Sequence, residues 1–195
     1  MQGQVAVFSL TDSVVTNQDI VSHPLLHCQE VRQVAATENN QLVFTCLHPG
    51  CVIYQWSVQT KTIVNKLDCS KLIPCSESLV TINIDDGFSP GRCQVSSVSV
   101  SAGLVYIGTC WGCMVVAEAG SLAPITIFRP YNAEIQSLVS FSPTQARHCM
   151  VSLGRGYRNL IQRYCTNRTS DEDNTEVESN KMFALLWRTD SWLMD

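Results

Sequence analysis

The chain has 195 residues, a formal net charge of -4 at pH 7, 45% hydrophobic residues and only 15% charged residues. Its few basic residues form no long run, which argues against nucleic acid or an anionic membrane as the main partner, because a basic patch marks both kinds of binding. No apolar stretch approaches the roughly 20 residues that cross a membrane, and no positively charged segment precedes the first apolar run, so we expect a cytoplasmic protein without membrane insertion.

The first predicted element is a strand at residues 5–10, VAVFSL. The polar residues after it indicate a loop, with an outer strand at residues 20–26. We interpret residues 1–28 as the end of an incomplete structural unit followed by this loop.

Residues 31–67 predict four antiparallel strands, and the same pattern returns at residues 94–128. The centres of the two units, residues 41–58 and 103–120, align without a gap. Each centre has an apolar run rich in β-branched and aromatic residues, a turn that ends in Gly, and a second apolar run. Self-similarity of this kind indicates a repeat, and four antiparallel strands per unit are typical of a propeller blade.

The turns of the two units end in Gly50 and Gly112, and we expect each glycine to take a positive φ. The first unit also ends its third strand on Trp56-Ser57, where WD-type repeats carry Trp-Asp. These residues support the interpretation of each unit as a blade.

Residues 68–92 lie between the two units and are interrupted by Pro, Gly and Asp, with one strand-like run at residues 78–84. We predict an insertion there, on a rim of the propeller. A third blade spans residues 134–192. Its long turn contains residues 166–180, which are polar and acidic, and we expect a disordered loop because little apolar surface offsets the entropy of ordering. A docking site for a basic partner is the alternative for this loop.

The predicted fold is all-β, a partial WD40-like β-propeller with about three to four four-stranded antiparallel blades. Most propellers close a ring, so that no blade exposes its edge strands. We therefore favour the interpretation that the chain is the tail of a longer ring.

The chain contains ten cysteines. Without a secretory signal, we expect reduced and mostly buried thiols that pack as small hydrophobes. The C-x-x-C of Cys110 and Cys113 could be a redox pair, but a strand follows it, and the helix N-terminus that lowers a thiol pKa is missing. A zinc site shared with Cys46, His48 and Cys51 is an alternative, because these three residues occupy the equivalent turn of the preceding blade.

The histidines show no arrangement with Ser, Cys or Asp that suggests a catalytic triad, and no Gly-rich loop of phosphate-binding length is present. We predict no catalytic residue, no cofactor and no metal in this chain. The chain itself is therefore not expected to be an enzyme.

Four runs of residues carry a family resemblance: LVYIGTCWGCMVVAEAG, ITIFRPYNAEIQSLVSFSP, MVSLGRGYRNLI and FALLWRTDSW. Over residues 31–192 the chain resembles the C-terminal WD40 region of the leucine-rich-repeat kinases that also carry a Roc GTPase and a COR domain. The leucine-rich repeat kinase one branch is the nearest. The resemblance implies a scaffold for self-association and protein docking, within a cytoplasmic serine/threonine kinase that binds GTP. The C-terminal propeller of a Rho guanine-nucleotide exchange factor is the alternative.

The sequence defines a partner surface only by residue type. Aromatic residues and Arg are enriched in interface hot spots, so we select Trp111, which we expect in an exposed turn, together with Arg155 and Tyr157. The alternative for Trp111 is packing against a neighbouring turn.

Overall fold

The computed structural model describes most of the chain as strands and their turns; the described ranges are residues 4–11, 14–22, 30–39, 41–48, 50–73, 93–144, 147–156 and 181–189. Within these ranges the regular structure is β-strand apart from one short 3-10 helix, η1 (Cys69–Lys71). Three sequence expectations lie outside the described ranges: the strand at residues 78–84, the disordered loop at residues 166–180, and Tyr157.

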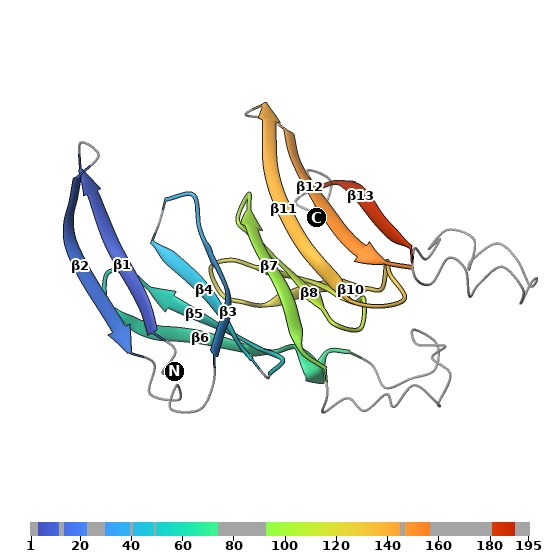
Figure 1. The fold of residues 1–195 in the computed structure, drawn as a ribbon, viewed down its shortest axis with the longest axis horizontal. Coiled ribbons are helices and arrows are strands. Elements are labelled where there is room, and N and C mark those ends of the chain that lie inside the picture. The colour runs from blue at the N-terminus through green and yellow to red at the C-terminus, as the bar shows by residue number, and fades with distance from the viewer. Residues whose placement is uncertain are drawn as a thin grey trace, which may run out of the picture.

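The strands form four antiparallel sheets (Figure 1). An N-terminal hairpin pairs β1 (Gln4–Thr11) with β2 (Val14–Ser22). Sheet I contains β3 (Glu30–Ala36), β4 (Leu42–His48), β5 (Val52–Ser57) and β6 (Thr62–Asp68). Sheet II contains β7 (Val95–Ser101), β8 (Leu104–Thr109), β9 (Met114–Glu118) and β10 (Pro124–Phe128). Sheet III contains β11 (Ile135–Thr144), β12 (Arg147–Arg155) and β13 (Met182–Arg188).

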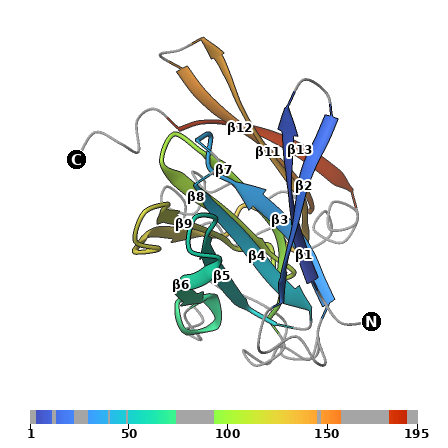
Figure 2. The same cartoon turned by 90° about the vertical axis from the view of Figure 1, so that its left-hand side faces the viewer.

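Figure 1 shows the four sheets one after another, with the hairpin of β1 and β2 at one end and sheet III at the other. In the turned view of Figure 2, the tip of the β11 and β12 hairpin projects beyond the neighbouring strands. Sheet II lies between sheets I and III, so each of its two faces can pack against a neighbouring sheet.

Local chemistry accounts for the tight turns of sheet II. β7 and β8 are joined by Ala102 and Gly103, whose φ angles are 52° and 75°. Two consecutive positive φ values define the turn that matches the twist of a two-residue hairpin. Gly112, in the turn between β8 and β9, has a φ of 71°, as the sequence predicted. The φ angle of Gly50 depends on residue 49, which lies outside the described ranges, so a positive φ at Gly50 stays a prediction; the carbonyl of Gly50 accepts a hydrogen bond from Val95 N at 2.9 Å.

The N-terminal region differs from its prediction at one element. β2 begins at Val14, not near residue 20, and pairs with β1 almost directly after it. The run Val14-Val15-Thr16 explains the difference, because β-branched residues favour strands, and the polar residues that suggested a loop fall within this strand.

Sheets I and II pack through one apolar cluster. It includes Phe44 and Ile53 from sheet I and Val105, Ile107 and Val115 from sheet II. All five side chains are fully buried. The carboxamide of Gln55, on β5, adds a polar link because its Nε2 donates to Ala119 O at 2.6 Å.

Sheets II and III pack through a second cluster on the opposite face of sheet II. Leu104, Tyr106 and Met114 belong to it, together with Ile135 and Met150 from sheet III. Alternate residues of β8 therefore enter different cores, Leu104 and Tyr106 toward sheet III and Val105 and Ile107 toward sheet I. This division follows from the period of two along a strand.

Candidate functional site

Trp111 lies in the turn between β8 and β9 and is half-buried. Its side chain packs against the cluster between sheets I and II. Its carbonyl accepts a hydrogen bond from Arg129 Nε at 2.8 Å. The turn is therefore held from two sides, and part of the indole still meets solvent.

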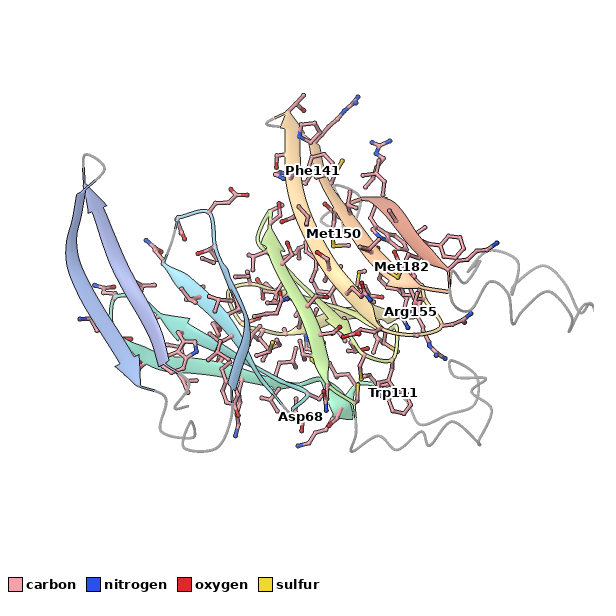
Figure 3. The ribbon with its side chains drawn as sticks, viewed as in Figure 1. Asp68, Trp111, Phe141, Met150, Arg155 and Met182 are labelled. Carbon is pink, nitrogen blue, oxygen red and sulfur yellow. The ribbon has the colours of Figure 1, made fainter. Side chains whose placement is uncertain are left out.

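Arg155 is exposed at the end of β12. Its backbone anchors the segment that connects sheets II and III, because its carbonyl accepts hydrogen bonds from Asn132 N and Ala133 N, both at 3.1 Å. Its own amide donates to Glu134 O at 3.3 Å. The guanidinium is thus displayed from a fixed backbone. Figure 3 shows Arg155 and Trp111 toward the same end of the molecule.

The connecting segment, residues 129–134, brings the two predicted residues into one region. At one end Arg129 contacts the carbonyl of Trp111, and Tyr131 N donates to Gly112 O at 3.4 Å. At the other end the segment contacts Arg155 through Asn132. Arg129 also closes the segment on itself, since its Nη2 donates to Asn132 O at 2.7 Å. We call residues 111–112, 129–134 and 155 the rim site.

Tyr131 anchors the rim site to the core. Its side chain is fully buried, and its hydroxyl lies 2.8 Å from Ser152 O and 2.7 Å from Ser152 Oγ. Burial raises the pKa of Tyr131, so the phenol stays neutral. Gly112 and Gly154 are required beside it, because a Cβ at Gly112 would meet the carbonyl of Tyr131 and one at Gly154 would meet its ring.

The sequence did not identify Arg129 or Tyr131 as functional residues, because Pro130 indicated only a turn in this segment. One signal was available. A glycine inside a strand marks a close approach of another part of the chain, and Gly154 lies inside β12. Tyr131 is the group that approaches it.

A chain of thiols lies near the junction of sheets I and II. Cys51 shares side-chain hydrogen bonds with Cys69 and Cys93, and Cys93 shares one with Cys110. The bond to Cys69 and burial raise the pKa of Cys51. The bond that Cys110 donates to Cys93, together with burial, raises the pKa of Cys110. For Cys93, the bond with Cys110 lowers the pKa, but the bond with Cys51 and burial outweigh it. Neutral thiols are poor nucleophiles, so the arrangement fits packing better than redox chemistry.

The described cysteines are thiols and not disulfides. Within the described ranges, no group of three or more His, Cys, Asp or Glu side chains is arranged to hold a metal ion. The zinc alternative around Cys46, Cys51, Cys110 and Cys113 therefore receives no support from these residues. In the described part of the chain, no helix has the length and apolarity needed to cross a membrane.

Comparison with known proteins yields one family and several similar folds. A model of the family described as "LRRK2 beta propeller" matches residues 2–177. Over 109 residues the chain is 28% identical to leucine-rich repeat serine/threonine-protein kinase 1 of Caenorhabditis elegans, a match that covers 55% of this chain and 5% of that kinase.

Two solved structures show the same fold at low sequence identity. A chain of the mitotic checkpoint complex matches with a TM-score of 0.54 and 11% identity, over 77% of this chain and 41% of that chain. Sqt1 of Saccharomyces cerevisiae matches with a TM-score of 0.50 and 10% identity, over 77% of this chain and 35% of that chain. Together with the family match, they confirm the prediction of an all-β, partial WD40-like β-propeller.

Proposed function

The chain belongs to the LRRK2 β-propeller family, and from that premise we propose that it is a non-catalytic module for protein interaction or self-association. The resemblance to the leucine-rich-repeat kinases is confirmed by this membership and by the match to the nematode kinase. The chain is a propeller domain, and its described residues are occupied mainly in packing sheets against one another.

One observation carries the proposal. Residues 129–134 are tied to the turn of Trp111 and to the end of β12, so that an aromatic side chain and an arginine are presented from one braced region. Residues held by rigid neighbours lose little entropy when a partner binds, and Trp and Arg are frequent hot spots. We propose that Trp111, Arg155 and Tyr157 contact a protein partner.

The same proposal extends to the longer protein of which this chain would be a part. We propose that the chain forms the C-terminal portion of a cytoplasmic serine/threonine kinase that also carries a GTP-binding domain. Its blades would be residues 31–67, 94–128 and 134–192, with residues 1–28 contributed to an incomplete blade. The family match favours this parent over a Rho exchange factor.

The test uses the immobilised 195-residue chain and quantifies by mass spectrometry the proteins that it retains from a cell extract. Trp111→Ala and Arg155→Ala are expected to lower the recovery of specific partners by about tenfold, the effect of removing one hot-spot residue. The matched control is Ile125→Ala, because Ile125 is 50% exposed on β10 and lies outside the rim site. Equal recovery with Trp111→Ala, Arg155→Ala and the native chain would refute the assignment of the rim site.

Self-association is tested on the same preparations by light scattering. A concentration-dependent increase in mass that Trp111→Ala abolishes would make a second copy the partner of the rim site. A monomer at every concentration, with partners still retained on the immobilised chain, would restrict the function to binding other proteins.

A further inference from the structure

The hairpin of β11 and β12 extends beyond the sheet against which it packs. β11 is linked to β7 as far as Ser140, whose Oγ donates to Val100 O at 3.0 Å. β7 ends one residue later, whereas β11 continues to Thr144. Figure 2 shows the resulting projection of the hairpin beyond the neighbouring strands. We call residues 141–144 and 147–149 the hairpin tip.

A β-bulge lies within the hairpin tip. The register between β11 and β12 shifts between residues 141 and 144, so that Ser142 and Pro143 on β11 lie opposite the single residue His148 on β12. Two residues opposite one define a bulge, which interrupts the ladder and redirects a side chain. Pro143 suits this position because it has no amide to donate. Ser142 and Pro143 are both exposed, so the bulge presents this dipeptide to solvent.

A serine followed by a proline is the substrate dipeptide of proline-directed protein kinases. The residue before a proline favours an extended backbone, and a kinase pocket that leaves an amide unpaired selects proline as the residue that follows the acceptor. In this chain two residues of the Ser and Thr type precede a proline, Ser89 and Ser142, and Ser89 lies outside the described ranges. Ser142 therefore combines the dipeptide with an exposed position outside the regular ladder.

The surroundings of Ser142 favour a phosphorylated side chain. Its Oγ lies 2.8 Å from Nδ1 of His148, which is half-buried. Arg147, beside His148, and Arg188, at the neighbouring end of β13, are both exposed. β11 and β12 contain no Asp or Glu. A phosphate group adds negative charge and strong acceptor oxygens, and both are complementary to these donors and cations.

We propose that Ser142 is a phosphorylation site for a proline-directed protein kinase and that His148 donates a hydrogen bond to the phosphate. The Ser142 oxygen attacks the γ-phosphorus of ATP bound to that kinase. The bond from this phosphorus to the bridging oxygen breaks, ADP leaves, and the serine proton passes to a carboxylate of the kinase. In the product the phosphate links β11 to β12 through His148 and strengthens the bulge.

This inference does not depend on the rim site. β12 begins in the hairpin tip and ends at Arg155, so the two regions lie at opposite ends of one strand. Failure of either proposal would leave the other unaffected.

The test uses the 195-residue chain with Ser89→Ala, which leaves Ser142 as its one serine or threonine before a proline. The chain is incubated with ATP and a purified kinase of the mitogen-activated class, and phosphate is located by peptide mass spectrometry. We expect phosphate at Ser142 and none at Ser121, which is exposed but does not precede a proline. Equal phosphate at both serines would show that exposure alone selects the residue and would overturn the proposal.

Two variants test the recognition of the dipeptide. Pro143→Ala keeps the serine and should lower the initial rate of phosphorylation about tenfold or more. The matched control is Thr144→Ala, an exposed neighbour whose substitution should leave the rate within about twofold.

A peptide of residues 136–150 gives the rate for the same sequence without the fold. Opening an exposed tip breaks few contacts, so the rate for the chain should lie within about tenfold of that for the peptide.

The role of His148 is tested by thermal unfolding of chains with and without the phosphate. Phosphorylation should raise the unfolding midpoint by about 2 °C, and His148→Ala should remove this rise because the phosphate loses its donor on β12. An equal rise in His148→Ala would overturn the contact between His148 and the phosphate.

The site itself would be overturned by the absence of phosphate at Ser142 or by an unchanged rate with Pro143→Ala. A rate for the chain more than about tenfold below that of the peptide would also overturn it, because the fold would then withhold Ser142 from the kinase.

Discussion

Sheets II and III have similarly apolar strands but different surroundings. In sheet II, β8 is buried at every residue, and β9 is buried from Met114 to Ala117. In sheet III, β13 alternates between exposed and half-buried residues along MFALLWR. Sheet II has a neighbour on each face, whereas sheet III contacts sheet II on one face only in the described structure.

The difference shows that apolar sequence and burial need not coincide. A strand covered on both faces is expected to be continuously apolar, and a strand exposed on one face is expected to alternate with polar residues. β13 has the composition of a covered strand and the exposure of an uncovered one.

The largest expected difference in stability is between substitutions on the two faces of sheet III. Met150→Ala should lower the free energy of unfolding by about 3 kcal/mol, because Met150 is fully buried against sheet II and its removal leaves a cavity. Leu186→Ala should cost about 0.5 kcal/mol or less, since the side chain is mostly exposed. Urea unfolding of both variants measures the difference. Similar losses would show that the outer face of sheet III is covered in solution.

The close approach between sheets II and III gives a second prediction. Gly154→Ala places a methyl group against the ring of Tyr131, which is fully buried and cannot move aside, and should cost about 2 kcal/mol. The matched control is Gly120→Ala, because no atom lies near the Cβ position at Gly120. Thermal unfolding compares the two. An unchanged midpoint for Gly154→Ala would contradict the packing described for this junction.

The junction between sheets I and II differs from the other because it contains thiols. The folded-state pKa values of Cys51, Cys93 and Cys110 are raised above the unfolded values, so the stability that depends on their protons is present below about pH 8.5 and is lost as the pH rises. The loss should be at most about 1.4 kcal/mol per pH unit for each thiol, and smaller for the partly exposed Cys110.

Unfolding by urea under reducing conditions at several pH values between 7.5 and 10 tests this thiol dependence. Cys93→Ala should reduce the loss of unfolding free energy as the pH rises, since it removes the thiol that links Cys51 to Cys110. A decline of the same slope in Cys93→Ala would show that the alkaline loss arises elsewhere.

The smallest expected effect concerns the anchor of the rim site. Tyr131→Phe removes the hydroxyl that contacts Ser152 and should cost about 1 kcal/mol, the usual net value of one buried hydrogen bond. If the rim site binds a partner, the variant should also weaken that partner modestly, because the connecting segment loses part of its support. Calorimetric unfolding provides the stability change; no change in the unfolding temperature would argue against the anchoring role.

The strands of sheets I and II were predictable because their signal is local. Runs such as LVYIGT and MVVAE favour strands by composition, and the gap-free repeat of residues 41–58 at 103–120 supplied the pairing pattern. The role of Tyr131 was not predictable, since it depends on contacts with Ser152 and Gly154 that are distant in sequence. For Trp111 the sequence left exposure and packing as alternatives, because whether a turn residue meets a core depends on how the sheets pack.

The open edge of β13 is tested most directly by residue-resolved amide hydrogen exchange in the isolated chain. We predict slow exchange throughout β8 and β9, and an alternation along β13 in which Phe183, Leu185 and Trp187 are protected while Met182, Ala184 and Leu186 exchange rapidly. Uniform protection along β13 would show that another strand pairs with its outer edge, and it would contradict the three-stranded pairing described for sheet III.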